Sequence, residues 1–197
     1  MSFLDNLKQA KKILAHSTDY LQETADIACA IQGSEIDRMV DALSIITGRL
    51  FIIGLGGSMA NSIHMAADFR KLCNINAFAF DNIAELTARA NDEGLENIFT
   101  GWLSNIGKDD ALFVLSVGGG TLRVSLSIVN AIDHAQSCGA KIFGIVGPNG
   151  GYTWTRGDVV IRIPATKNIT PHTEAFQAVI WHALVSHPLL QRNATKW

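Results

Sequence analysis

The stretch around residue 55 constrains the fold of this chain more than any other part. An apolar run, residues 51–53, stops at three glycines in four positions, residues 54–57, and helical spacing of apolar residues follows. A strand, a glycine loop and a helix in this order aim backbone N–H groups and the Ser58 hydroxyl at one place, where the helix dipole favours an anion. The order predicts a phosphate-binding loop that includes Gly56, Gly57 and Ser58; a glycine turn that binds nothing is the alternative.

Two titratable side chains follow on the same predicted helix. His64 and Asp68 are four residues apart, so both emerge on one face of the helix beyond the predicted anion site. Such a pair forms either a hydrogen bond on the helix surface or part of a chemical site beside the anion.

Apolar runs of strand length alternate with helical stretches along the rest of the chain. This alternation predicts an α/β fold, a three-layer α/β/α sandwich with a five-stranded parallel sheet. The expected strands are residues 50–53, 77–80, 111–115, 141–146 and 159–163. Three of them end in glycine loops, at residues 54–57, 118–120 and 147–151. Since ligands of open α/β sheets bind at the carboxyl ends of strands, the site is expected there.

Helices are predicted at both ends of the chain. Residues 3–47 read as two helices broken at Gly33, with Ser34 as the N-cap of the second. The last helix is expected to open at Thr170, with a proline at its first position, and to end near residue 186. Its apolar stripe of Phe176, Val179 and Ala183 is expected to pack on the domain.

Glu174 and His182 lie on this last helix, eight residues apart, with the small Ala178 between them. This spacing leaves room for a ligand beside both side chains. Each residue also has a plainer explanation, because an acid is favoured in a first helical turn and a histidine can be a core residue.

Length and composition bound the remaining possibilities. The 197 residues are expected to form one domain, with N-terminal helices at 1–48, an α/β core at 49–187 and a tail at 188–197. The net charge is −2 and the basic residues are scattered, which argues against nucleic-acid and membrane partners and favours a small molecule. Cys29, Cys73 and Cys138 show no metal or disulfide spacing, and no signal peptide or membrane span is visible, so a cytoplasmic location is expected.

The helix after the first glycine loop also predicts self-association. It carries apolar residues on two sides, among them Met59 and Ile63 on one and Met65 and Leu72 on the other. A helix that is apolar on two sides needs cover on both. We expect a second copy of the chain to supply it, in a closed symmetric oligomer with active sites near the interfaces.

Taken in order, these segments resemble the sugar isomerase (SIS) domain family and, within it, the phosphoheptose isomerases, which interconvert sedoheptulose 7-phosphate and glycero-manno-heptose 7-phosphate. The resemblance covers nearly the whole chain. It rests on the loop at residues 54–58, the His64 and Asp68 pair, Asn91-Asp92, the loop opened by Ser116, and the last helix with His182.

The resemblance implies a flavodoxin-like SIS fold, a phosphosugar substrate, a cytoplasmic homotetramer and a place in lipopolysaccharide heptose biosynthesis. It makes Asp68 the catalytic base and His182 the acid. The implied substrate-binding residues are Gly56, Gly57, Ser58, Asn91, Asp92, Ser116, Gly118, Gly119, Thr121 and Glu174. The implied ligands of zinc or another divalent metal are His64, Asp68, Glu174 and His182.

The chain departs from the family pattern at four places. Leu55 replaces an asparagine, Asp68 a glutamate and Glu174 a glutamine, and residues 116–121 read Ser-Val-Gly-Gly-Gly-Thr in place of a hydroxyl-rich loop. These changes leave two further hypotheses open: an isomerase for a different phosphosugar, and a non-catalytic SIS protein such as a replication-initiator-binding adaptor or a sugar-phosphate sensor. Asn91-Asp92 also has a plain explanation, as part of a turn.

Overall fold

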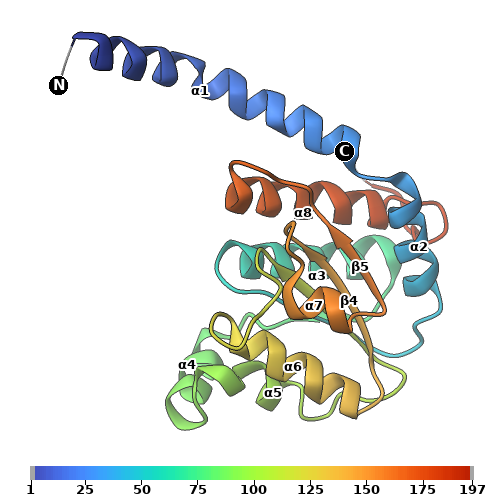
Figure 1. Ribbon diagram of the computed structural model, residues 1–197. Coiled ribbons are helices and arrows are strands. Elements are labelled where there is room, and N and C mark those ends of the chain that lie inside the picture. The colour runs from blue at the N-terminus through green and yellow to red at the C-terminus, as the bar shows by residue number, and fades with distance from the viewer. Residues whose placement is uncertain (1–2, 196–197) are drawn as a thin grey trace.

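The structure is a computed structural model that describes residues 3–195, with the side chains of all of these except residues 3–4, 6–12 and 14. It is a three-layer α/β/α sandwich around a five-stranded, all-parallel sheet of order β2-β1-β3-β4-β5 (Figure 1). The strands are β1 Leu50–Ile53, β2 Ala77–Ala79, β3 Ala111–Ser116, β4 Lys141–Val146 and β5 Val159–Arg162. The predicted fold class is therefore confirmed, and each strand lies within one residue of its predicted bounds.

Helices cover both faces of the sheet (Figure 1). One face carries α2 Gly33–Ser44, α3 Gly57–Cys73 and α8 Ile169–Val185, with α1 Phe3–Ala30 lying across α8. The other carries α4 Ile83–Asp92, the 3₁₀ turn η1 Leu95–Asn97, α5 Ile98–Trp102, α6 Leu126–Ser137 and α7 Gly151–Arg156. No helix among the described residues is both long and apolar enough to cross a membrane.

The central strands are apolar throughout because both of their faces are covered. Every residue of β1 and β3 is buried. Alternate side chains enter different cores: Leu50 and Ile52 pack with α3 and α8, while Phe51 and Ile53 pack with α5 and α6. The carboxyl ends of β1 and β3, which are neighbours, thereby place their two glycine loops side by side.

Two predicted helix starts are wrong. The N-cap of α2 is Gln32 and not Ser34, and no cap bond from its side chain is found among the described residues. Helix α8 begins at Ile169, before the expected Thr170 cap, with Asn168 as its N-cap.

The predicted apolar stripe of the last helix is also wrong. Phe176 is buried, but Val179 is 55% exposed and Ala183 is only partly buried. The buried face of α8 includes the polar side chains His172, Thr173 and Gln177. These side chains contact other elements. The face of α8 that is buried in the core is therefore not the face that its apolar residues predict.

Candidate active site

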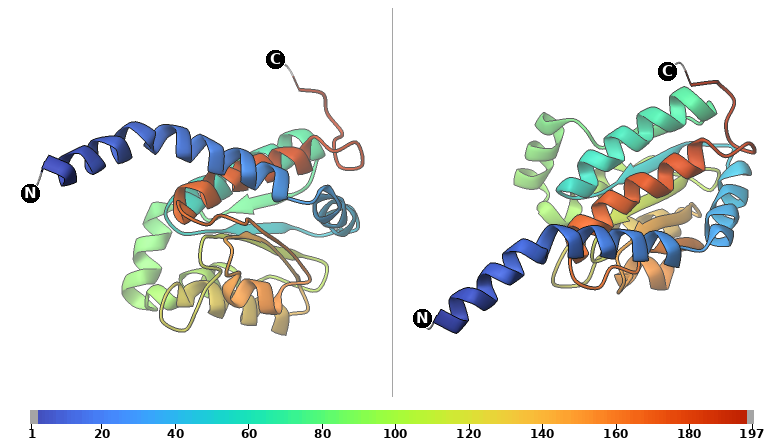
Figure 2. Two further views of the ribbon diagram at one scale, coloured as in Figure 1. Left: turned by 45° about the horizontal axis from the view of Figure 1, so that its top comes forward. Right: turned by 90° about the horizontal axis from the view of Figure 1, so that it is seen from above.

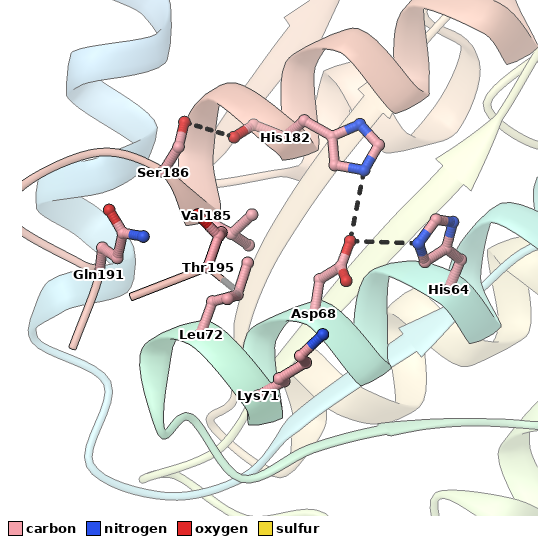
Figure 3. A pocket seen from close by; sticks show the side chains of 9 residues that line it. All are labelled: His64, Asp68, Lys71, Leu72, His182, Val185, Ser186, Gln191 and Thr195. Atoms are coloured by element: carbon pink, nitrogen blue, oxygen red, sulfur yellow. Dashed lines mark hydrogen bonds and ion pairs between the residues drawn. The ribbon is translucent and has the colours of Figure 1, made fainter. Parts of the chain in front are cut away.

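Helices α3 and α8 lie side by side and run in the same direction, and together they form a cluster of two histidines and one aspartate (Figures 2 and 3). Oδ2 of Asp68 lies 3.4 Å from Nε2 of His64 and 3.4 Å from Nε2 of His182. The side chain of Asp68 is 15% exposed, whereas those of the two histidines are 60% and 52% exposed. The carboxylate therefore lies at the base of the cluster and the imidazoles face the opening.

This cluster fits a divalent metal ion. One ligand atom from each of His64, Asp68 and His182 lies within 4.8 Å of the other two, the one such group found in the part of the chain that the structure describes. Two imidazole nitrogens and a carboxylate oxygen are ligands of zinc, and three protein ligands leave a fourth position open for water or substrate. The chemistry of the donor set therefore suits the implied metal.

Glu174, the fourth implied ligand, is not in that group. Its carboxylate lies against the Cα of Gly57, in the space that a Cβ at residue 57 would fill. Eight residues of helix, about 12 Å, separate Glu174 from His182, so within one chain the two side chains contact different parts of α3. A side chain at residue 57 would displace the Glu174 carboxylate from this place.

A buried polar network, not predicted from the sequence, joins the two helices between these points. Asn61 donates from Nδ2 to Oε1 of Gln177 at 2.8 Å and to the Glu174 carbonyl at 2.9 Å. Gln177 donates from Nε2 to the Ser58 hydroxyl at 3.1 Å and has no exposed surface. This network fixes the start of α3 against α8 and so sets the position of the Ser58 hydroxyl.

A cavity of about 320 Å³ lies at the carboxyl ends of β1 and β3. Four predicted substrate-binding residues line it: Ser58, Ser116, Gly118 and Thr121. The rest of the lining is Leu55, Val117, Gly120, Val124 and Ser125. The structure thus brings both loop hydroxyls and the Ser58 hydroxyl to one cavity.

The loop hydroxyls also hold the loop in shape. Ser116 Oγ accepts a hydrogen bond from the Gly119 N–H at 3.0 Å, and Thr121 Oγ1 accepts one from the Val124 N–H at 2.9 Å. Gly119 has φ +70°, a Cβ there would collide with the Gly150 carbonyl, and the Gly119 carbonyl accepts from Thr153 Oγ1 at 2.8 Å. The glycine loop after β4 therefore supports the glycine loop after β3.

The other predicted substrate-binding residues lie outside this cavity lining. Gly56 is the N-cap of α3 with φ +59°. Asn91 and Asp92 are the last two residues of α4, where Asn91 Nδ2 donates to Asp92 Oδ1 at 2.7 Å. They belong to a helix and not to the turn that was their alternative explanation.

A larger cavity, about 720 Å³, adjoins the histidine–aspartate cluster on the C-terminal side (Figure 3). Its walls come from α3, α8 and the segment after α8. They are His64, Asp68, Lys71, Leu72, His182, Val185, Ser186, Gln191 and Thr195. The tail is held there because the N–H groups of Arg192 and Asn193 donate to the Leu72 carbonyl at 2.8 and 3.0 Å.

A buried glutamate of α1 anchors the start of α8. Glu23 is 6% exposed and accepts hydrogen bonds from the backbone N–H groups of Thr166, Lys167 and Asn168 at 2.9, 2.6 and 3.3 Å. These donors, the Lys167 N–H above all, lower the pKa of Glu23 to about 2 although burial acts in the opposite direction. The carboxylate thereby holds residues 166–168, the segment that leads into α8.

Comparisons with known proteins agree with this architecture. No protein-family model matches the chain. It is 30% identical over 158 residues to a phosphoheptose isomerase of Haemophilus ducreyi, covering 73% of this chain and 79% of that protein. It is also 30% identical over 163 residues to a phosphoheptose isomerase of Rhodospirillum rubrum, covering 79% of this chain and 84% of that protein.

Solved structures show the same fold. A phosphoheptose isomerase of Neisseria gonorrhoeae superposes with a TM-score of 0.75 at 19% identity, over 90% of this chain and 96% of that one. One of Francisella tularensis gives a TM-score of 0.74 at 22% identity, over 94% and 97% of the two chains. At these identities the structural likeness supports the fold alone.

Proposed function

The chain belongs to the phosphoheptose isomerase family of SIS-domain proteins, and from that premise we propose that it is an aldose–ketose isomerase of a phosphorylated sugar. The substrate pair we propose is sedoheptulose 7-phosphate and glycero-manno-heptose 7-phosphate. One observation carries the proposal. His182 of α8 lies beside His64 and Asp68 of α3, and the first turn of α3 lines the cavity of about 320 Å³.

Isomerisation moves a proton between adjacent carbons through an enediolate, and needs a base, an acid and a handle for the rest of the sugar. In the proposed reaction Asp68 removes the carbon-bound proton and His182 exchanges the proton of the neighbouring oxygen. The hydroxyls of Ser58, Ser116 and Thr121 and the loop N–H groups hold the phosphate.

The geometry favours a long phosphosugar. Ten residues of α3 separate Ser58 from Asp68, about 15 Å of helix axis. A three-carbon phosphosugar is too short to bridge this span. A seven-carbon sugar phosphate matches it better.

We further propose that His64, Asp68 and His182 hold zinc or another divalent ion, with Glu174 of the predicted set lying apart in a single chain. A bound ion of this kind supplies Lewis-acid stabilisation of the enediolate. A tightly held Asp68 is a weaker base, so metal occupancy and proton transfer compete for the same carboxylate.

The homotetramer, the cytoplasmic location and the place in lipopolysaccharide heptose biosynthesis belong to this proposal as well. The cysteines of the described chain, Cys29, Cys73 and Cys138, are all free thiols, which agrees with a reducing compartment. The adaptor or sensor hypothesis is less well supported, since a protein without chemistry has no need of three converging metal-type ligands.

Turnover of the purified protein tests the proposal. Sedoheptulose 7-phosphate is incubated with the protein, with and without added zinc, and formation of the aldose is followed. We expect turnover in the wild type and a loss of at least about 100-fold in Asp68→Asn, the scale of general base catalysis. No turnover, together with an unchanged melting temperature in the presence of the sugar phosphate, contradicts the isomerase and favours the adaptor.

A further inference from the structure

An indole N–H holds the carboxylate of the cluster in place. Trp181 Nε1 donates to Oδ2 of Asp68 at 3.1 Å, the same oxygen that lies 3.4 Å from each of the two histidine Nε2 atoms. An aspartate side chain has few rotatable bonds, so one anchored oxygen fixes the orientation of the whole carboxylate.

Trp181 is itself fully buried. It is 1% exposed and belongs to the core between α8 and the sheet. Its ring lies 5.4 Å from the ring of His64 and 4.9 Å from that of His182, centroid to centroid. One buried side chain therefore adjoins all three members of the cluster.

The indole differs chemically from the two imidazoles. A histidine nitrogen that binds a metal ion has no proton to donate, so Nε2 ligation by His64 and His182 ends any hydrogen bond from them to Asp68. The indole N–H is a donor in every protonation state of the site. With an ion bound, Trp181 is the one of these three neighbours that still donates to the carboxylate.

We infer that Trp181 is a positioning residue that orients Asp68 as a metal ligand, an inference that rests on the metal site proposed above. Groups that hydrogen-bond to metal ligands hold them in the geometry that the ion requires, and their loss costs about 10- to 100-fold in metal affinity. Neither the spacing of His64 and Asp68 nor the family pattern points to this residue.

Zinc binding to the whole chain tests the inference, without substrate. Trp181→Phe keeps an aromatic ring in the core and removes the donor; Trp154→Phe, on the partly exposed Trp154 of α7, is the matched control. By calorimetry with zinc chloride we expect Trp181→Phe to bind zinc about 10- to 100-fold more weakly and Trp154→Phe to bind as the wild type does. Wild-type zinc affinity in a folded Trp181→Phe protein overturns the inference.

A measurement on the wild type keeps the test decisive if Trp181→Phe does not fold. The chain has four tryptophans, so its 1H–15N correlation NMR spectrum contains four indole N–H signals. We expect zinc to shift the Trp181 signal most, and an unmoved Trp181 signal at saturating zinc overturns the inference. A wild type that binds no zinc overturns the metal site and this inference together, whereas zinc binding without sugar turnover overturns only the isomerase.

Discussion

Gln177 shows how a single buried amide connects α3 and α8, the two helices that form the candidate site. It accepts from Asn61 and donates to Ser58, and it has no exposed surface. Replacing it with alanine removes a partner from both neighbours while Ser58 stays buried. We expect Gln177→Ala to lower the free energy of unfolding by about 1–3 kcal/mol, the cost of unsatisfied buried polar groups, measured by urea denaturation.

Gln22→Ala is the control for this prediction. Gln22 is exposed on α1, where its Nε2 donates to Oδ1 of Asp26, so its loss should change stability far less. Equal stability of the two variants would mean that the Asn61–Gln177–Ser58 network contributes little.

At this scale, functional residues can be predicted from the sequence when they are close neighbours on one helix, but not when their partners are far away in the chain. His64 and Asp68 are readable because four residues of helix bring them together. Gln177 was missed because its partners are more than 100 residues away in the chain. One signal was available: position 177 shares a face with Ile180 and Leu184, so a polar residue there is enclosed by the core.

Between elements, Glu23 links α1 to the start of α8 and gives folding stability a pH dependence. Its pKa is about 2 in the folded protein against an ordinary value of 4.5. A lowered pKa means that the carboxylate stabilises the fold fully above the unfolded value, and that this contribution is lost as the pH falls from about 4.5 towards 2.

The Glu23→Gln variant tests this link. Its amide cannot accept from all of the N–H groups of residues 166–168, so we expect a lower melting temperature than the wild type at neutral pH. The difference should stay constant above about pH 5 and shrink as the pH falls through 4 to 3. Melting curves by circular dichroism between pH 3 and 7 measure it, and a difference that does not change with pH would contradict the assignment.

The glycine loop after β3 offers a second test between elements. Gly119 has φ +70°, and a Cβ there would collide with the Gly150 carbonyl of the neighbouring loop. Gly118 is its matched control, since a Cβ at that position meets nothing within 4 Å. We expect Gly119→Ala to destabilise the protein by about 1–3 kcal/mol and Gly118→Ala to leave the melting temperature nearly unchanged. Similar melting temperatures of the two variants would show that the glycine loop after β4 does not constrain the loop after β3.

Strands were predicted more accurately than the edges and faces of helices, for physical reasons. Strands such as β1 and β3 are buried on both faces, so their apolar runs mark them directly. The buried face of α8 is set by the elements that it packs against. Gln177 and Trp181 of α8, for example, are buried where they bond to Ser58 and Asp68 of α3. Its apolar residues alone therefore indicated the wrong stripe, at Val179.

Over the whole molecule, the feature with no intramolecular explanation is the exposed apolar surface of α1. This helix extends beyond the sandwich (Figure 2), and Ile13 and Leu21 on it are each 67% exposed. Ile63 of α3, beside the histidine–aspartate cluster, is 39% exposed, which agrees with the expectation that α3 needs a second cover. Exposed apolar side chains that gather on one face are typical of interfaces between subunits, and we expect these residues to belong to one.

If copies of the chain associate through α1, charges on its apolar face should separate them. We expect the double variant Ile13→Glu/Leu21→Glu to elute with a lower molar mass than the wild type in size-exclusion chromatography with light scattering, because each glutamate would be buried without a partner in the interface. Ala15→Glu, at an exposed position on the same helix but more than a quarter turn from both, is the control and should keep the wild-type mass. A monomeric wild type would contradict the association itself, and a double variant of unchanged mass would place the interface away from these residues. Loss of turnover together with loss of mass would show that the active site needs the assembled state.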